Sequence, residues 1–336
     1  MNQSHAIRLL VIVLNYRTAQ MTLRAAEAAL ADMPENGAEM IIVDNASNDG
    51  SAEVLQAAIT DRGWNVGARV RLILSPRNGG FGAGNNLGLR AGMSDGSTPD
   101  YFYVVNSDAF ADPGCIGALM AHLQTHPKAG IAGSHVRGDD DAAHCTAFRF
   151  PSIAGEFEGA ARTGFVSKAL RGAIVAPPLP QTTTQVDWVA GASVLLRGEM
   201  LRDIGLFDEA FFLYFEETDL CKRAARAGWE CWYVPKSRVV HIGSVSTGMK
   251  EWQRMPLYWF ASRRHYFVKN HGRIYAGLAW AARLSGGMIH QVRCAMSGQK
   301  PQDAPYFQRD LLRHGLGLGL AESSRMTNRP TTEDRP

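Results

Sequence analysis

Short runs of mainly apolar residues alternate with helix-like segments through the first half of the chain, and this alternation restricts the fold more than any other feature. Four runs are expected to be buried strands, at residues 9–14, 40–43, 70–74 and 101–105. Continuous apolar character is typical of strands that are covered on both faces. Helix-like stretches at 19–31 and 52–59 follow the first two runs. Repeated strand–helix units of this length predict an α/β fold with a mainly parallel, doubly wound sheet.

The second half of the chain is less regular. Residues 137–185 lack a clear period and are expected to form an irregular excursion that carries an edge strand. A strand at 192–196 and a helix near 198–204 are expected to follow. The stretch from 252 to about 320 has the pattern of helices with aromatic and basic faces. The polar composition of residues 321–336 predicts a disordered tail.

Length and composition narrow the class of protein. A chain of 336 residues that is 46% hydrophobic is large enough for one sizeable α/β domain and an appendage. Charged residues or glycines interrupt each apolar run before it reaches membrane-spanning length, and no signal-peptide pattern precedes the first strand. The five cysteines include no Cys-x-x-Cys pair, which argues against a disulfide framework and a zinc knuckle. These features favour the cytosol.

Charge is distributed unevenly along the chain. Residues 1–248 contain 21 Lys and Arg against 26 Asp and Glu, whereas residues 249–336 contain 14 against 6. A basic C-terminal part indicates an anionic partner, and a membrane surface is favoured over nucleic acid because no nucleic-acid-binding motif accompanies the charge. Solvation of amphipathic helices explains the same charge equally well.

Polar residues follow the carboxyl ends of the expected strands, where open α/β sheets bind ligands. Asp44 ends the second strand and can accept hydrogen bonds from a ribose or a base, although an Asx-type turn cap is the alternative. The segment 78–86 is rich in Gly and Asn, which permit close approach of a ligand and offer donors and acceptors. It lacks the Gly-Lys-Ser/Thr ending of a Walker loop.

The motif Asn106-Ser107-Asp108 ends the fourth strand. Its outer side chains point the same way from an extended segment, which suits a hard divalent cation, and a turn cap is the alternative. Asp108 is expected to bind Mg²⁺ or Mn²⁺, with Asn106 acting through water or on the sugar. His241 closes a later apolar strand and is a second candidate ligand.

Three carboxylates lie within four residues at Glu216, Glu217 and Asp219, directly after the aromatic run 211–215. Carboxylates this close bind a cation, hold a proton or face water. A solvated first helical turn, where acids suit the helix dipole, is the alternative for the cluster taken alone.

Taken together, these motifs resemble those of the family 2 glycosyltransferases, in the branch that includes bacterial rhamnosyltransferases of cell-surface polysaccharide assembly. The resemblance runs from about residue 7 to residue 271. The motifs occur in the family's order, from Leu14-Asn15-Tyr16 and Val43-Asp44-Asn45 through segment 78–88, Asn106-Ser107-Asp108, Gly191-Ala192 and segment 205–220 to His241-Ile242-Gly243-Ser244. The ordered set is far more specific than any one motif.

The resemblance implies a GT-A fold, a nucleotide-diphosphate sugar donor and a divalent cation, Mn²⁺ or Mg²⁺. It implies that Asp108 and His241 hold the metal, that Gly191 and Trp188 line the acceptor side, and that Glu217 is the general base. Asp219 is the reserve base and Glu216 a supporting acid. The implied nucleotide-sugar residues are Asn15, Asp44, Asn78, Gly82, Asn85, Asn86, Asn106 and Asp108. Two departures from the family pattern are Glu217 in place of Asp and Asn106 where other branches carry Asp.

The expected function is therefore inverting, metal-dependent transfer of a sugar, with rhamnose suggested by the branch, to a cell-surface glycan or polyprenyl-diphosphate-linked acceptor. The implied organisation is a catalytic domain over 1–248, with a nucleotide-sugar half at about 1–136 and an acceptor half at about 186–248, followed by a helical region at 249–320. The C-terminal part is expected to dock on the inner face of the cytoplasmic membrane. A nucleotidyltransferase-type enzyme and a non-catalytic carbohydrate-binding relative are the alternatives.

Overall fold

The computed structural model describes residues 7–243 and 254–318, which form two compact units. The first unit contains residues 7–150, 176–212 and 216–243. The second contains residues 151–175, 213–215 and 254–318. Two segments from before residue 248 thus pack with the C-terminal helices. The expected tail at 321–336, Ser244 of the last motif and Trp252 lie outside the described residues.

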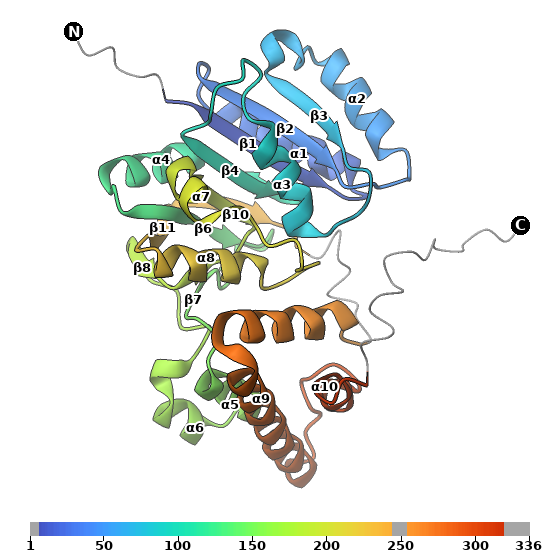
Figure 1. The fold of residues 1–336 in the computed structure, drawn as a ribbon, viewed down its shortest axis with the longest axis vertical. Coiled ribbons are helices and arrows are strands. Elements are labelled where there is room, and N and C mark those ends of the chain that lie inside the picture. The colour runs from blue at the N-terminus through green and yellow to red at the C-terminus, as the bar shows by residue number, and fades with distance from the viewer. Residues whose placement is uncertain (1–6, 244–253, 319–336) are drawn as a thin grey trace, which may run out of the picture. The chain divides into compact units, whose positions relative to one another are not determined.

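The first half of the large sheet is parallel, as predicted (Figure 1). Its strands lie in the order β3 (Val70–Leu74), β2 (Ala38–Asp44), β1 (Leu9–Asn15), β4 (Tyr101–Asn106). Helices α1 (Ala19–Asp32), α2 (Ser51–Asp61) and α3 (Phe81–Ala91) connect them. Each strand therefore ends at the same edge, which carries Asn15, Asp44 and Asn106.

The second half makes the sheet mixed. Strand β10 (Ser193–Arg197) is antiparallel to both β4 and β6 (Ala129–Arg137), and β11 (Glu230–His241) is parallel to β6. Strands β5 (Ala109–Ala111) and β8 (Thr184–Val186) pair antiparallel with β11, and β7 (Ala147–Phe148) pairs with β9 (Trp188–Val189). Because β10 begins beside the carboxyl end of β4, it is antiparallel to both of its neighbours. The expected edge strand is β8.

The sheet is covered on both faces, as its continuous apolar strands predict. Side chains of β1 alternate between two clusters, with Leu9, Val11 and Val13 on one face and Leu10 and Ile12 on the other. Helices α1, α2 and α4 (Cys115–Thr125) supply the first cluster, whereas α3, α7 (Gly198–Ile204) and α8 (Glu216–Arg226) supply the second. A fully buried side chain of this size contributes about 1.5–3 kcal/mol, so these strands form a rigid base for their polar ends.

The second unit is helical. It contains α5 (Ile153–Ala161), α6 (Gly164–Ala169), α9 (Leu257–Ser297) and α10 (Phe307–Gly315). Helix α9 bends at Gly272, whose φ is +85° (Figure 1). Helix α5 lies in the stretch expected to be irregular. That expectation was wrong because α5 is short and rich in Gly and Ala, and it is stabilised by packing on α9 and by the Ser152 cap rather than by an apolar period.

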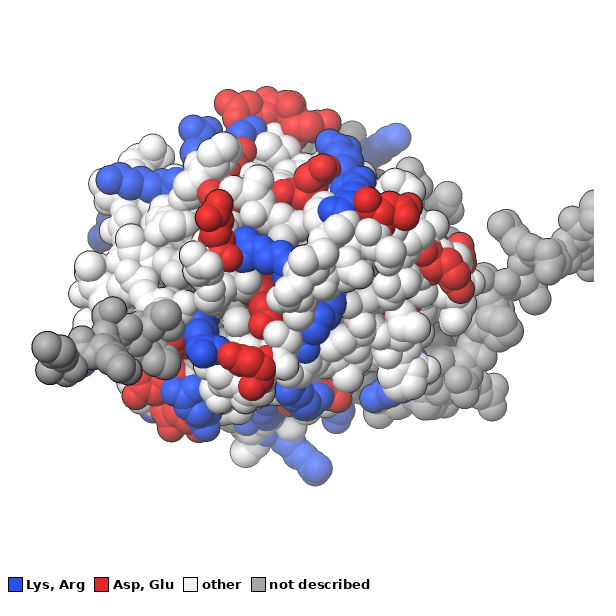
Figure 2. Space-filling view, turned by 90° about the horizontal axis from the view of Figure 1, so that it is seen from above, with Lys and Arg blue, Asp and Glu red and all other residues white. Residues whose placement is uncertain are grey.

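Several aromatic and basic residues of the C-terminal region are buried within this unit. Phe260, Tyr266 and Phe267 are at most 3% exposed. Arg263 is equally buried and pairs with Glu156 at 2.9 Å. The packing role is thus the observed one for these residues. No helix among the described residues has both the length and the apolar character to cross a membrane. Figure 2 shows a face of the molecule where acidic and basic side chains are intermixed.

Candidate active site

Asp108 and His241 meet at the edge of the sheet although 133 residues separate them. The register of β11 against β5 places His241 opposite Ala109, next to Asp108. The Nε2 atom of His241 lies 3.0 Å from Oδ1 of Asp108, and the main-chain N–H of Ile242 donates to the carbonyl oxygen of Asp108. The pairing of two strand ends therefore brings the two predicted metal ligands together.

Asn106 completes this group. Its Nδ2 lies 3.4 Å from Nε2 of His241, and its main-chain N–H donates to the carbonyl oxygen of Ala192. Its Oδ1 is buried and accepts no hydrogen bond within the described residues. Carboxylate oxygen, amide oxygen and imidazole nitrogen are suitable donors for Mn²⁺ or Mg²⁺, so the residues fit such an ion.

The protein supplies only part of a coordination shell here. Across residues 7–243 and 254–318, no three His, Cys, Asp or Glu side chains are grouped so that they could hold a metal ion. A six-coordinate cation at Asp108 and His241 would thus take its remaining ligands from substrate phosphates and water, as Mg²⁺ commonly does.

The acidic cluster is the first turn of α8, where Glu217 is partly exposed and the other two acids are buried. Glu216 and Asp219 are at most 2% exposed. Burial raises the pKa of the Glu217 carboxyl, and the main-chain N–H groups of Glu217, Gly191 and Thr218 oppose part of that rise. Oε2 of Glu217 is buried and accepts no hydrogen bond from a described residue. Glu217 thus has the raised pKa and the unengaged oxygen expected of a general base.

Asp219 is engaged differently. Its Oδ2 accepts a hydrogen bond from Nε of Arg223 at 2.9 Å. The same guanidinium donates to the carbonyl oxygens of Ile204, Gly205 and Leu206. Asp219 therefore neutralises the arginine that fixes the loop before α8.

Gly191 and Ala192 lie between Glu217 and Asn106 and contact both residues. A Cβ atom at this position would lie 3.2 Å from the Phe81 ring and 4.0 Å from Cβ of Glu217. The next residue, Ala192, accepts the hydrogen bond from Asn106. Trp188, four residues before Ala192, stacks on Phe148 at 4.1 Å and donates from Nε1 to a carbonyl oxygen. Of the two predicted acceptor-side residues, Gly191 thus lies beside Glu217, whereas the Trp188 ring packs on Phe148.

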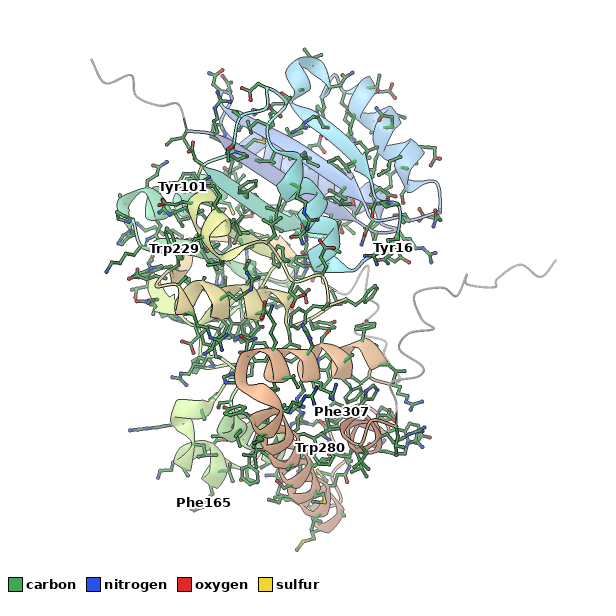
Figure 3. All side chains as sticks on the ribbon, viewed as in Figure 1. Tyr16, Tyr101, Phe165, Trp229, Trp280 and Phe307 are labelled. Atoms are coloured by element: carbon green, nitrogen blue, oxygen red, sulfur yellow. The ribbon has the colours of Figure 1, made fainter. Side chains whose placement is uncertain are left out.

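Asn15 and Asp44 form a buried pair at the ends of β1 and β2. Nδ2 of Asn15 donates to Oδ1 of Asp44 at 2.7 Å, and Ser47 donates to Asp44 from both its main-chain N–H and its hydroxyl. The turn cap considered from sequence is therefore present. Figure 3 labels Tyr16, which follows Asn15 at this end of the sheet. Ser47, two residues after the motif Val43-Asp44-Asn45, is a positioning residue that sequence reasoning did not single out.

The Gly/Asn segment is mostly helical rather than a loop, because α3 begins at Phe81. Its glycines allow the helix to approach β1, since a Cβ atom at Gly84 would lie 2.5 Å from Leu14 and one at Gly88 would lie 2.9 Å from Ile12. Gly82 likewise packs against Phe207. These glycines therefore have a packing role in the structure.

The preceding loop is tied to the site by side-chain amides. Nδ2 of Asn45 donates to Oδ1 of Asn78 at 2.9 Å and to the carbonyl oxygen of Gly80. At Gly80 the φ is +88°, and a Cβ atom there would lie 1.8 Å from the carbonyl oxygen of Phe212. No residue other than glycine fits at this contact.

The two asparagines of α3 differ in their contacts. Nδ2 of Asn86 donates to the carbonyl oxygen of Phe207 and to Glu209, and its Oδ1 accepts from the main-chain N–H of Phe207. Asn86 therefore fixes the segment that leads to α8. Asn85 donates to the carbonyl oxygen of Phe81, and its buried Oδ1 accepts no hydrogen bond within the described chain. Of the two, Asn85 is the one with a spare acceptor.

Comparison with known proteins agrees with this arrangement. The chain matches the family model Glycosyl transferase family 2 over residues 10–171 and Glycosyl transferase family group 2 over residues 101–296. It is 29% identical over 278 residues to N-acetylglucosaminyl-diphospho-decaprenol L-rhamnosyltransferase of Mycobacterium tuberculosis, covering 72% of this chain and 87% of that protein. Rhamnosyltransferase WbbL of Escherichia coli is 40% identical over 58 residues, 17% of this chain and 22% of that one.

Solved structures show the same fold at low sequence identity. Mannosyltransferase PcManGT from Pyrobaculum calidifontis, in complex with GDP-Man and Mn²⁺, has a TM-score of 0.55 and 16% identity, covering 96% of this chain and 83% of that one. GalNAc-T7 with UDP, GalNAc and Mn²⁺ has a TM-score of 0.58 and 13% identity, covering 97% and 58%. The chain is thus a glycosyltransferase with the GT-A fold, and it belongs to family 2.

Proposed function

We propose that the protein transfers a sugar, with rhamnose the first candidate, from a nucleotide-diphosphate donor to a polyprenyl-diphosphate-linked or other cell-surface glycan acceptor, with inversion. The observation that carries this proposal is the meeting of Asp108 and His241 at 3.0 Å, joined to Glu217 through the segment Gly191-Ala192. The named relatives, two of them rhamnosyltransferases, support the choice of donor and acceptor.

The chain's own residues account for a single displacement. Glu217 takes the proton from the acceptor hydroxyl as that oxygen attacks the anomeric carbon, and the bond from that carbon to the diphosphate breaks. Asn15, Asp44, Asn78 and Asn85 are proposed to form the donor side. Mn²⁺ or Mg²⁺ held by Asp108 and His241 would neutralise charge on the departing diphosphate. One displacement without an enzyme nucleophile inverts the configuration.

A donor screen tests the proposal. Purified protein with Mn²⁺ is incubated with a panel of nucleotide sugars, and release of nucleoside diphosphate is measured. We expect release from one donor, its loss in EDTA, and loss of Mn²⁺-dependent donor binding in Asp108→Ala. Release of pyrophosphate would favour the nucleotidyltransferase alternative, and full transfer in EDTA would refute the metal assignment.

We also propose that the protein docks on a membrane surface through the second half of α9. From Arg273 to Ser297 there are three Lys and Arg and no Asp or Glu. Exposed apolar side chains recur at positions i, i+4, i+14, i+18 and i+22 and so share one face: Ile274, Leu278, Met288, Val292 and Met296. A helix with such a face and basic flanks is suited to lie on an anionic bilayer.

Flotation with phosphatidylglycerol vesicles tests this docking. We expect the wild-type protein to float and the Leu278→Gln, Val292→Gln double variant to remain in solution. Equal recovery of the two proteins would leave α9 with a packing role only.

A further inference from the structure

The second unit contains a cavity of about 310 Å³ in the angle of the bent helix α9. Figure 3 labels Trp280 on α9 and Phe307 on α10, two helices that pack against each other. The cavity has an apolar wall made by Phe260, Phe267, Trp280 and Leu311. Arg264 and Arg273, one on each side of the Gly272 bend, line the same space. Apolar surface and guanidinium groups therefore converge on one cavity.

Among the residues that the structure describes, basic side chains of the second unit far outnumber acidic ones. The described part of the second unit contains 13 Lys and Arg but only four Asp and Glu. Each of these acids already has a partner, Glu156 with Arg263 and Arg283, Asp310 with Arg254, Asp303 with Arg162, and Glu158 with Ser167. Arg264 and Arg273 are exposed and form no ion pair with any described residue. The cavity thus presents two uncompensated guanidinium groups.

This combination selects a particular ligand chemistry. One guanidinium group can donate two parallel hydrogen bonds to the oxygens of a phosphate. Two guanidinium groups match the charge of a diphosphate. The volume lies at the lower end of the range for small-molecule sites, so it suits a phosphate group with a few attached carbons. The exposed side chains Ile274 and Leu278 lie on the same turns as Arg273 and offer apolar surface for the rest of a chain.

We propose that this cavity binds a phosphate or diphosphate group attached to an apolar chain. Because a polyprenyl-diphosphate-linked acceptor carries that group, the inference deepens the proposed function and rests on it. The headgroup of a phospholipid has the same chemistry. In either case the site is separate from Asp108, His241 and Glu217, so it concerns capture of the lipid end rather than the reacting sugar.

Calorimetric titration of the full-length protein with geranyl diphosphate tests the site. We expect binding by the wild type and roughly 10- to 100-fold weaker binding in Arg264→Gln and in Arg273→Gln, since each variant removes a charge-assisted contact. Lys300→Gln, at an exposed basic residue that does not line the cavity, is the matched control and should bind normally. Gly277→Leu, which adds a side chain at the cavity lining where a Cβ meets no atom, should also weaken binding.

Three measurements separate the outcomes. Unchanged affinity in both arginine variants, or equal affinity for inorganic diphosphate and geranyl diphosphate, would overturn the proposal. If flotation with phosphatidylglycerol vesicles falls in the arginine variants, the phospholipid headgroup is the source; if it does not, the acceptor is. Nucleoside diphosphate release from the donor should be unchanged in Lys300→Gln, and its absence in the wild type would refute the proposed function without affecting the titration.

Discussion

Glu217→Gln should affect the reaction rate and Asp219→Asn the stability, although the two residues share one helical turn. The first substitution removes the proposed base and keeps the shape of the side chain. The second removes the charge that pairs with Arg223. We therefore expect a folded, inactive protein in the first case and a destabilised protein in the second.

The rate effect of Glu217→Gln follows from the loss of a positioned base. General catalysis contributes about 10²–10⁴-fold, which is about 3–5 kcal/mol of transition-state stabilisation. The side chain is neutral after substitution and still fits beside Gly191. Donor affinity should therefore remain within a factor of about two or three of the wild type, whereas kcat falls by the full amount.

The pH dependence has a definite sign. The proposed base acts as an ionised carboxylate, and burial raises the pKa of Glu217. The rate should therefore fall, as pH decreases, at a higher pH than an ordinary Glu would give. Since the folded pKa lies above the unfolded one, ionisation of Glu217 costs stability as pH rises through that window. Glu217→Gln should thus leave the melting temperature at neutral pH unchanged or higher.

Asp219→Asn should instead lower the melting temperature. Removal of one partner from a buried ion pair costs about 3–5 kcal/mol. The lower value applies because the Arg223 side chain keeps 19% of its surface exposed. For a unit of this size, 3 kcal/mol corresponds to a decrease of roughly 6–12 °C. If Asp219→Asn instead abolished kcat at an unchanged melting temperature, and Glu217→Gln stayed active, the two roles would be exchanged.

Two further substitutions test the packing. Gly80→Ala should cost more than about 3 kcal/mol in chemical denaturation, because its Cβ would lie 1.8 Å from the Phe212 carbonyl oxygen; Gly205→Ala has a similar positive φ and no atom within 4 Å, so it should cost only about 1–3 kcal/mol of strain, and equal losses would contradict the clash. Glu156→Gln should destabilise the helical unit by about 3–5 kcal/mol because it leaves Arg263 and a second arginine unpaired, and an unchanged thermal transition would show that this buried cluster contributes little.

The first half of the fold could be predicted from the sequence because its signals are local. Most of the parallel strands are continuous apolar runs, and β2 and β4 end at polar residues, so the positions of Asp44 and Asn106 at one sheet edge followed from strand boundaries alone. The mixed second half did not follow in the same way. The direction of β10 depends on where the chain returns from residues 137–185, which is set by packing of distant segments.

Contacts between distant residues also limited the interpretation of the site. The sequence presents Asn86, Asp219 and Glu217 as equally polar candidates. Only the fold shows that Asn86 is engaged with Phe207 and Asp219 with Arg223, which leaves Glu217 with an unengaged oxygen. Likewise, the spacing of the glycines in α3 is compatible with a ligand loop or with close helix packing, and the distance to β1 decides between them.

The aromatic run before the acidic cluster has a physical explanation in the division of the chain. Residues 213–215 pack with the helical unit, where Phe215 contacts Trp259 and Tyr266, and the carbonyl oxygen of Leu213 accepts a hydrogen bond from Ser262. Tyr214 and Phe215 both have a φ of +70°, which costs a non-glycine residue about 1–2 kcal/mol. Aromatic packing offsets that strain. The next residue, Glu216, begins helix α8, so the strained aromatic residues immediately precede the turn that carries the proposed base.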